Sequence, residues 1–186
     1  MIRSYLRVLV LALAFVSDAS AQAGETPAEF WVTPTVPGFG PIHEFEGAAY
    51  VPDKARTYKV VFALTKGVTD PHEITPGLES VARAVNLYVY AGVPLSHLKF
   101  VVIANGDTAS LALDDAHYTE KFGTRNPNLA LIAELRKVGV DVVVCGQAVV
   151  GNQYDYNWID KSVTIALSAV TTITGLQQRG YALMPL

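Results

Sequence analysis

Apolar residues gather in short, dense runs along this chain. Three runs are the strongest, and they cover residues 58–64, 98–104 and 140–145. Runs rich in β-branched residues, unbroken by polar positions, are typical of strands that are covered on both faces of a sheet. Weaker runs at residues 163–167 and 181–184 predict two further strands. The pattern therefore predicts a sheet of about five strands.

Segments with a helical period of apolar positions separate these strands. They predict helices over residues 77–91, 126–138 and 168–178, and the first two of these end at glycines. Residues 111–122 predict short helical pieces, whereas residues 146–160 show no regular pattern. Strands that alternate with helices indicate a mostly parallel sheet with helices on both of its faces. The predicted fold is therefore α/β, a three-layer α/β/α arrangement similar to flavodoxin and other Rossmann-like domains.

The first 21 residues have the three parts of a signal peptide. Arg3 and Arg7 supply a positively charged start, residues 8–16 are apolar, and Ala19-Ser20-Ala21 fits a cleavage site. The apolar run is shorter than a membrane-spanning helix, which needs about 20 residues. We therefore expect cleavage after Ala21, a periplasmic or secreted protein, and no membrane attachment after cleavage. An uncleaved membrane anchor is the alternative.

Residues 22–56 form an extension rich in proline and glycine, a composition that opposes helices and central strands. Its aromatic residues make it too apolar for a free linker, and they are Phe30, Trp31, Phe39, Phe45 and Tyr50. We expect the extension to lie across the α/β domain of residues 57–186, or across a neighbouring subunit, and to bury these rings there. We do not expect it to form a second domain.

Composition and motif spacing narrow the possible functions. The chain carries 14 Lys and Arg residues against 17 Asp and Glu residues, which gives a net charge of −3. Without a basic run, we expect no nucleic-acid partner. No spacing of His and Cys fits a metal site, and no G-x-G-x-x-G motif supports a dinucleotide site. We therefore expect neither a metal nor a cofactor.

Cys145 is the only cysteine of the chain, and it ends the third strong strand. The carboxyl-terminal edge of an open α/β sheet is where ligands and catalytic groups gather. A single thiol in an exported protein is buried and inert, paired with another chain, or reactive. We take Cys145 as the candidate nucleophile, and we expect the N–H groups of Gly146 and Gln147 to face its sulfur. Because Gly146 has no side chain, another molecule has room to approach.

Further candidate residues follow the neighbouring strands. The loop after the first strand holds Lys66 and His72, and His72 is the histidine that we expect at the edge that carries Cys145. Its alternative is a surface histidine with no catalytic role. The predicted substrate-binding residues are Asn105, Gly106, Gly146, Gln147, Lys66 and His72. Residues 152–158 are both polar and aromatic, which predicts either a lid or docking surface, or rings that pack against the domain.

Four segments together resemble the DsrE/DsrF-like family, which includes the TusD-type sulfur-relay proteins. These segments are Asn105-Gly106, residues 126–129 (NPNL), residues 140–147 (VDVVVCGQ) and residues 176–182 (LQQRGYA). The resemblance covers residues 58–186, and the part before it looks like the leader of exported members. It implies a compact α/β domain that assembles as a trimer or hexamer.

In the sulfur-relay branch of that family, the cysteine that matches Cys145 carries persulfide sulfur between partner proteins. Many members have His where this chain has Asn105, and sulfur-relay members often have Arg shortly after the cysteine, where this chain has residues 149–152 (VVGN). The resemblance leads to the hypothesis that Cys145 accepts sulfane sulfur from a donor protein and passes it to an acceptor thiol.

Two other classes of function remain open. One is a non-catalytic oligomeric module that binds a small ligand or a protein, with Cys145 in a structural role. The other is a redox sensor in which Cys145 forms a disulfide between subunits.

Overall fold

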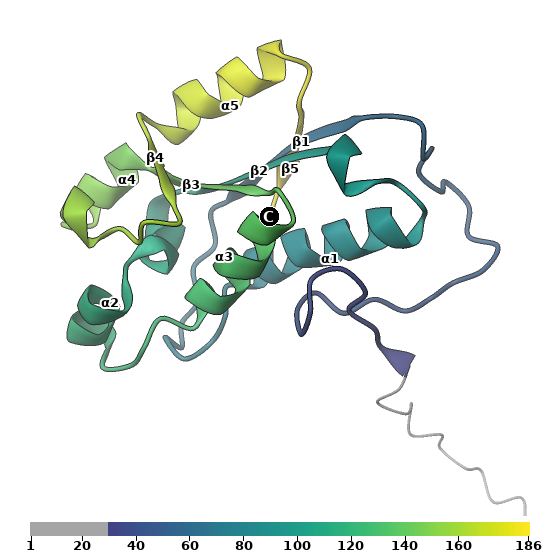
Figure 1. Ribbon diagram of the computed structural model, residues 1–186. Coiled ribbons are helices and arrows are strands. Elements are labelled where there is room, and N and C mark those ends of the chain that lie inside the picture. The colour runs from purple at the N-terminus through teal and green to yellow at the C-terminus, as the bar shows by residue number, and fades with distance from the viewer. Residues whose placement is uncertain (1–29) are drawn as a thin grey trace, which may run out of the picture.

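The computed structural model describes residues 30–186 (Figure 1). The expected signal peptide, residues 1–21, lies outside the described residues. Five parallel strands form one sheet in the order β4-β3-β2-β1-β5. The strands are β1 (Tyr58–Leu64), β2 (Leu98–Ala104), β3 (Asp141–Cys145), β4 (Thr164–Ala166) and β5 (Ala182–Pro185). The prediction of an α/β fold with a parallel sheet of about five strands is confirmed.

The described residues include α1 (Pro76–Tyr90), α2 (Asp115–Phe122), α3 (Asn128–Lys137), α4 (Gly146–Gly151) and α5 (Ala169–Gln178), together with the 3-10 turns η2 (Leu95–His97), η3 (Gly106–Ala112) and η4 (Tyr156–Trp158). α4 lies in the stretch for which no regular structure was expected. Its 6 residues span fewer than two turns, so they are too few to produce a helical period in the sequence. Within residues 30–186, no helix is both long enough and apolar enough to cross a membrane.

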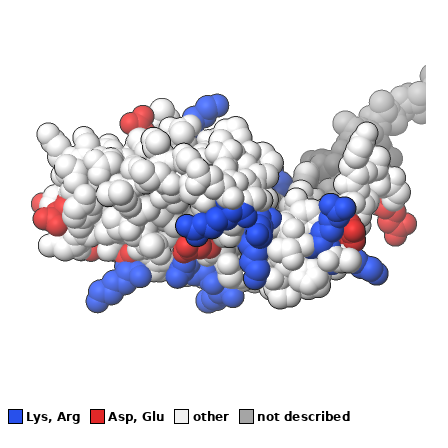
Figure 2. All heavy atoms as spheres, turned by 90° about the horizontal axis from the view of Figure 1, so that it is seen from above, with Lys and Arg blue, Asp and Glu red and all other residues white. Residues whose placement is uncertain are grey.

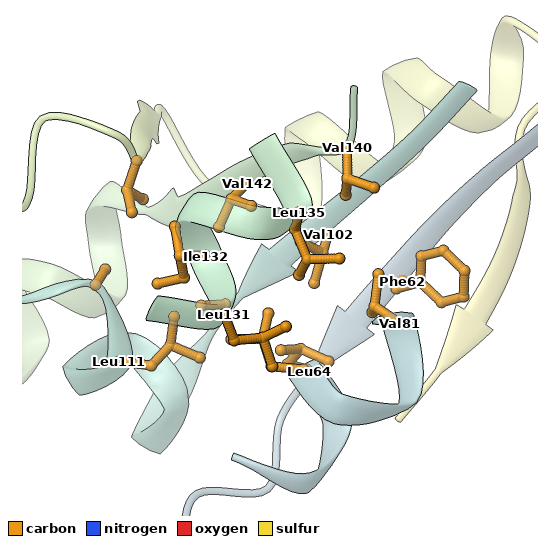
Figure 3. Packing of buried hydrophobic residues seen from close by; sticks show 14 of the residues in the cluster. Phe62, Leu64, Val81, Val102, Leu111, Leu131, Ile132, Leu135, Val140 and Val142 are labelled. Atoms are coloured by element: carbon orange, nitrogen blue, oxygen red, sulfur yellow. The ribbon is translucent and has the colours of Figure 1, made fainter. Parts of the chain in front are cut away.

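α1 and α3 pack on one face of the sheet, which we call the lower face after its place in Figure 1. α1 presents Leu78, Val81 and Val85 to the sheet at helical spacing, and all three are fully buried. Leu131 and Leu135 of α3 form a second fully buried row. Figure 3 shows side chains of both helices meeting those of the central strands. The main core of the protein therefore lies between the sheet and these two helices.

α5 is the main cover of the opposite, upper face of the sheet (Figure 1). Its residues Ala169, Ile173 and Leu176 follow a helical spacing and pack against the upper side chains of the strands. Leu167, just before the helix, and Val170, in its first turn, are each 75% exposed. The predicted three layers are present, but the upper layer covers less of the sheet than the lower one.

The extension is fastened to α1 through aliphatic residues rather than through most of its aromatic rings. Val36 and Ile42 are buried, and Phe39 packs against the main core. The other rings are exposed in this single chain, namely Phe30, Trp31, Phe45 and Tyr50. The expectation that the domain buries these four rings is therefore wrong within one chain.

A fully buried amide on α1 completes this attachment. The side-chain oxygen of Asn86 accepts hydrogen bonds from the backbone N–H groups of Thr35 and Val36, at 3.0 and 2.9 Å. Its side-chain nitrogen donates to the carbonyl oxygens of Phe39 and Gly40, at 2.9 and 2.8 Å. These four bonds use both donors and both acceptor positions of the amide, which offsets the cost of burying it. The extension is thereby held against the middle of α1.

Candidate functional site

Cys145 is the last residue of β3, and its side chain lies under the start of α5 on the upper face. The backbone N–H of Ala169 donates a hydrogen bond to Sγ, with 3.2 Å between the nitrogen and the sulfur. Ala169 is the first of the 10 residues of α5, and the hydroxyl of Ser168 caps the helix by accepting from the N–H of Thr171. The sulfur therefore lies at the N-terminal end of α5 and accepts a hydrogen bond from the first N–H group of that helix.

The chain changes from one face of the sheet to the other beside this cysteine. α4 follows β3 and buries Val149 in the lower core, whereas α5 follows β4 and packs on the upper face. Neighbouring parallel strands whose connections leave to opposite faces mark the place where open α/β sheets bind ligands. β3 and β4 are such neighbours, with Cys145 paired to Ala166. As the sequence predicts, Cys145 ends a strand at the carboxyl edge.

The protein's own backbone covers the sulfur, and Cys145 is only 3% exposed. The side-chain nitrogen of Gln147 donates to the carbonyl oxygen of Leu167 at 3.2 Å, which ties the β4–α5 connection to α4. A Cβ at Gly146 would stand 2.8 Å from the carbonyl oxygen of Ala166, so the space beside Gly146 is filled by β4 rather than by another molecule. The N–H that reaches the sulfur comes from Ala169, not from Gly146 or Gln147.

Asn105 and Gly106 lie at the same edge, one strand away. Ala104, the last residue of β2, pairs with Val144 of β3, so Asn105 follows β2 at the level of Cys145. The backbone N–H of Asn105 donates to the hydroxyl of Thr108 at 2.8 Å, and this fixes the turn after β2. The carbonyl oxygen of Gly106 accepts from the side chain of Asn152 at 3.1 Å.

The structure does not bring Lys66 and His72 to the sulfur. Lys66 lines a separate cavity of about 360 Å³ beside Gly77 and Leu186, near β1 and β5. His72 is in the loop after β1, where its Nδ1 lies 2.8 Å from Oδ1 of Asp70 and its side chain is 71% exposed. Hydrogen bonds from the backbone N–H and the ring of His72 lower the pKa of Asp70. Among the hydrogen bonds of the described residues, none joins Lys66 or His72 to Cys145.

Most of the aromatic residues at 152–158 pack against the domain. Tyr154 is buried under Lys121, whose Nζ lies 4.5 Å from the ring centre, and Trp158 stacks on His117 with 4.9 Å between the ring centres. Tyr156 alone among these rings is exposed, and its hydroxyl donates to the carbonyl oxygen of Gly146 at 3.3 Å. The packing interpretation therefore holds for Tyr154 and Trp158.

This arrangement suits a thiol that reacts only when its cover moves. The N–H group of Ala169 is already in place on the sulfur, but Cys145 is only 3% exposed. Sequence reasoning placed the start of a helix at Ser168 but missed the contact between Ala169 and Cys145. The pairing of β3 with β4 creates that contact, and a strand of three residues gives little sequence signal for its register.

Comparisons with known proteins agree with this fold. A family model described as the DsrE/DsrF-like family matches residues 58–186, which run from the start of β1 to the end of the chain. No curated protein matches the sequence. One similar solved structure is that of the protein of unknown function MTH1491 from Methanobacterium thermoautotrophicum, with 19% sequence identity and a TM-score of 0.51. The match covers 69% of this chain and 99% of that chain, and it supports the fold alone.

Proposed function

We propose that this chain, a member of the DsrE/DsrF-like family, handles sulfane sulfur through Cys145. The Cys145 thiolate attacks the outer sulfur of a donor persulfide, R–S–SH. A new S–S bond forms at Cys145, the donor's S–S bond breaks, and the donor leaves as the thiolate R–S⁻. An acceptor thiolate then attacks the outer sulfur of the Cys145 persulfide and restores the Cys145 thiolate. Neither step needs an external oxidant or reductant.

The observation that carries this proposal is the hydrogen bond from Ala169 to the sulfur of Cys145. The fold places Cys145 at a carboxyl edge of the sheet, and the start of α5 supplies it with an N–H donor of the kind that favours negative charge. In our proposal Asn105 and Gly106 border the same edge and help to orient the incoming sulfur. The hydrogen bond from Gln147 to Leu167 holds the β4–α5 connection in its closed position.

Because Cys145 is 3% exposed, the proposed reaction includes a local opening. The connection from Ala166 to Ser168 is the segment that has to move. It follows a strand of three residues at the edge of the sheet, and its Leu167 side chain is largely exposed. Segments with few buried contacts open with a small fraction of the free energy of global unfolding.

Mass spectrometry of the folded protein tests the transfer. After incubation with glutathione persulfide, we expect Cys145 to gain the mass of one sulfur atom, and we expect a small acceptor thiol to remove it. Cys145→Ser should gain nothing under the same conditions. A folded wild-type protein that stays unmodified, while a surface cysteine placed at Ala133 is loaded, would contradict the proposal.

A pair of glutamine variants tests the opening step. Gln147→Ala removes the hydrogen bond to Leu167 and should increase the rate at which Cys145 takes up sulfur by several-fold. Gln177→Ala changes an exposed glutamine on α5 and should leave the rate unchanged. Equal rates in the two variants and the wild type would show that the β4–α5 connection does not control access.

The second candidate is a non-catalytic oligomeric module, and the burial of Cys145 favours it. In that case the sulfur packs beneath α5, and a protein or small ligand binds elsewhere. Cys145→Ser would then retain partner binding and assembly, and no sulfur would be found on the wild-type thiol. The persulfide experiment thus separates the two candidates.

Assembly into a trimer or hexamer belongs to the same proposal. Residues 162–178 contain no Lys, Arg, Asp or Glu, and Figure 2, which views the upper face, shows a broad area without charged side chains. Val170 lies in this stretch, is 75% exposed, and is suited to an interface between copies. Light scattering should give a smaller mass for Val170→Lys than for wild type, whereas Ala133→Lys, on an exposed position of α3, should keep the wild-type mass.

We also propose that the protein is exported and then acts with a sulfur donor and an acceptor outside the cytoplasm. The support is the sequence of residues 1–21 alone. When the full chain is produced in a bacterial host, the periplasmic fraction should contain a protein whose N-terminal residue is Gln22. A chain that keeps Met1 and remains with the cells would overturn this part of the proposal.

A further inference from the structure

A cavity of about 510 Å³ lies between the extension and the end of α1. His43, Phe45 and residues 48–52 of the extension form one wall, and Leu87, Tyr88 and Tyr90 of α1 form the other. α1 covers the lower face of the sheet, whereas Cys145 packs on the upper face, so this cavity is separate from the thiol site. Its volume is within the range of small-molecule sites, about 300–1,000 Å³.

The chemistry of the walls restricts what the cavity accepts. Rings from both sides face it, including those of His43, Phe45 and Tyr88, and alanines leave space between them. None of the residues that line the cavity is Lys, Arg, Asp or Glu. Stacking between flat rings suits such walls, whereas a charged ligand would lose its hydration there without gaining a partner.

The ring of His43 has a fixed position at one end of the cavity. It packs on Phe30, with 3.7 Å between the ring centres, and meets the edge of Trp31 at 6.2 Å. Tyr88 is fixed as well, because its ring packs on Tyr58 and on Phe100 of the core, at 4.7 and 5.5 Å. The cavity thus has rings on both walls that pack against neighbouring rings, and the imidazole of His43 provides a hydrogen-bonding group.

Tyr50 differs from His43 and Tyr88 because its ring is not packed against other rings of the described residues. Its backbone has a φ of 57°, in the left-handed region that bulky residues rarely adopt, and its side chain is fully exposed although the residue lines the cavity. Backbone strain of this kind clusters at ligand-binding and switch regions of proteins. A ring held out from the rim is placed to close over a bound molecule.

We propose that this cavity binds a flat, uncharged aromatic small molecule, and that Tyr50 closes over it. His43 offers the polar contact, and the rings of Phe45 and Tyr88 offer the stacking surfaces. The other occupants of an apolar groove, namely a second copy of the chain or the chain's own residues 1–29, are outcomes that the experiment distinguishes.

Two dyes with the same rings and different charge test the ligand class. We expect N-phenylnaphthylamine, which is uncharged, to bind the full chain saturably with one site per protein and with a rise in fluorescence. Anilinonaphthalene sulfonate shares its rings but carries a negative charge, and it should bind at least tenfold more weakly. Unsaturable binding, or equal binding of the two dyes, would overturn the proposal.

Three variants test the location. Ala48→Trp fills the cavity and should weaken dye binding at least tenfold. Tyr50→Gly removes the closing ring and relieves the backbone strain, so it should weaken binding several-fold without lowering stability. Gln153→Gly is the matched control, because Gln153 has a φ of 61° and does not line the cavity, and it should leave binding unchanged.

The same variants identify the other occupants. If Ala48→Trp reduces the assembled mass of the protein in light scattering and dye binding follows the mass, a second copy fills the cavity. If the dye binds only after residues 1–29 are removed, the N-terminal segment fills it. Either result would overturn the proposal of a small-molecule site. Because Tyr50→Gly and Ala48→Trp are measured by dye binding and by unfolding, loss of fold is distinguishable from loss of the site.

Discussion

The two faces of the sheet are built from the same strands but are covered in different ways. On the lower face, α1 and α3 bury complete rows of leucine and valine, and the extension adds a further layer over α1. On the upper face, α5 buries Ala169 and partly buries Ile173 and Leu176. The lower face therefore supplies most of the stability, whereas the upper face has the capacity to open beside Cys145.

The extension repeats this contrast on a smaller scale. Its part near Val36 is buried and hydrogen-bonded to Asn86, whereas residues 43–52 leave a cavity against α1. In the sheet and in the extension alike, the firmly packed part fixes the position of the backbone. The less covered part holds the candidate site, which is Cys145 in the sheet and the cavity in the extension. Binding and catalytic residues are often placed in this way, on less stable segments positioned by a rigid scaffold.

The largest expected effect on the free energy of unfolding comes from shortening a core side chain, and we compare one such residue from each face. Leu131→Ala removes a fully buried side chain of α3 and should lower the free energy of unfolding by about 3 kcal/mol. Ile173→Ala on α5 should cost about 1 kcal/mol, because Ile173 is only partly buried. Urea unfolding at one protein concentration measures both. Equal losses would mean that another chain covers the upper face in solution, which would break the comparison.

Two glycines of the extension test its attachment to α1. A Cβ at Gly40 would meet the backbone nitrogen of Arg83 at 2.2 Å, and Gly40 has a φ of +57°. Gly40→Ala should therefore cost about 2 kcal/mol, because the segment has to lift from the helix. Gly38 also has a positive φ, of +80°, but a Cβ there would meet nothing within 4 Å.

Gly38→Ala is thus a matched control that carries only the conformational cost, about 1 kcal/mol. Urea unfolding measures both variants. If they lose the same stability, the contact between the extension and α1 is weaker in solution than the Asn86 hydrogen bonds indicate.

Much of the fold was predictable from the sequence, because it follows from local patterns. The runs at 58–64 and 98–104 match β1 and β2 in full, and the helix predicted over 77–91 differs from α1 by one residue at each end. β1 and β2 are dense apolar runs, and α1 has a regular apolar period and is followed by Gly92 and Pro94, all of which are strong local signals. α4 was missed because six residues are too few to show a period.

The sites were less predictable, because they depend on contacts between distant residues. Ala169 meets Cys145 across 24 positions of sequence, and Asn86 meets Val36 across 50. Neither residue type is unusual at its own position, so no local pattern marks it. The exposure of Tyr50 was unpredictable for the same reason, because aromatic composition indicates burial without indicating which surface supplies it.

The start of α5 provides a smaller test of the upper face. Ser168→Ala removes the hydroxyl that accepts from the N–H of Thr171 and should cost about 1 kcal/mol. The loss should appear mainly as faster labelling of Cys145 by a thiol reagent, because the freed helix end lies over the sulfur. Asp53→Ala, which removes a side-chain acceptor from the N–H of Ala55 in the extension, is the control and should not change labelling. Unchanged labelling in both variants would show that the end of α5 does not guard the thiol.

The smallest expected effect is the pH dependence of stability, because charged residues are distributed unequally between the two faces. Residues 162–178 hold no Asp, Glu, Lys or Arg, whereas α2, in the connection between β2 and β3, is capped by Asp114, which contacts His117. Burial by itself would raise the pKa of Asp114, but hydrogen bonds from the backbone N–H and the ring of His117 outweigh this and hold the pKa below its ordinary value. A carboxyl group with a lowered pKa in the folded state contributes stability above its unfolded pKa, about 3.9. That contribution is lost as the pH falls through the folded pKa.

Asp114→Asn keeps the helix cap and removes the charge. Its loss of stability relative to wild type should therefore be largest above about pH 5 and should shrink as the pH falls below about 4. Urea unfolding across that range measures the difference. The loss from Ser168→Ala should stay constant over the same range, because neither Ser168 nor Thr171 titrates there. If both losses vary together with pH, the upper face is coupled to the charges of the lower layer, and the two faces are not independent.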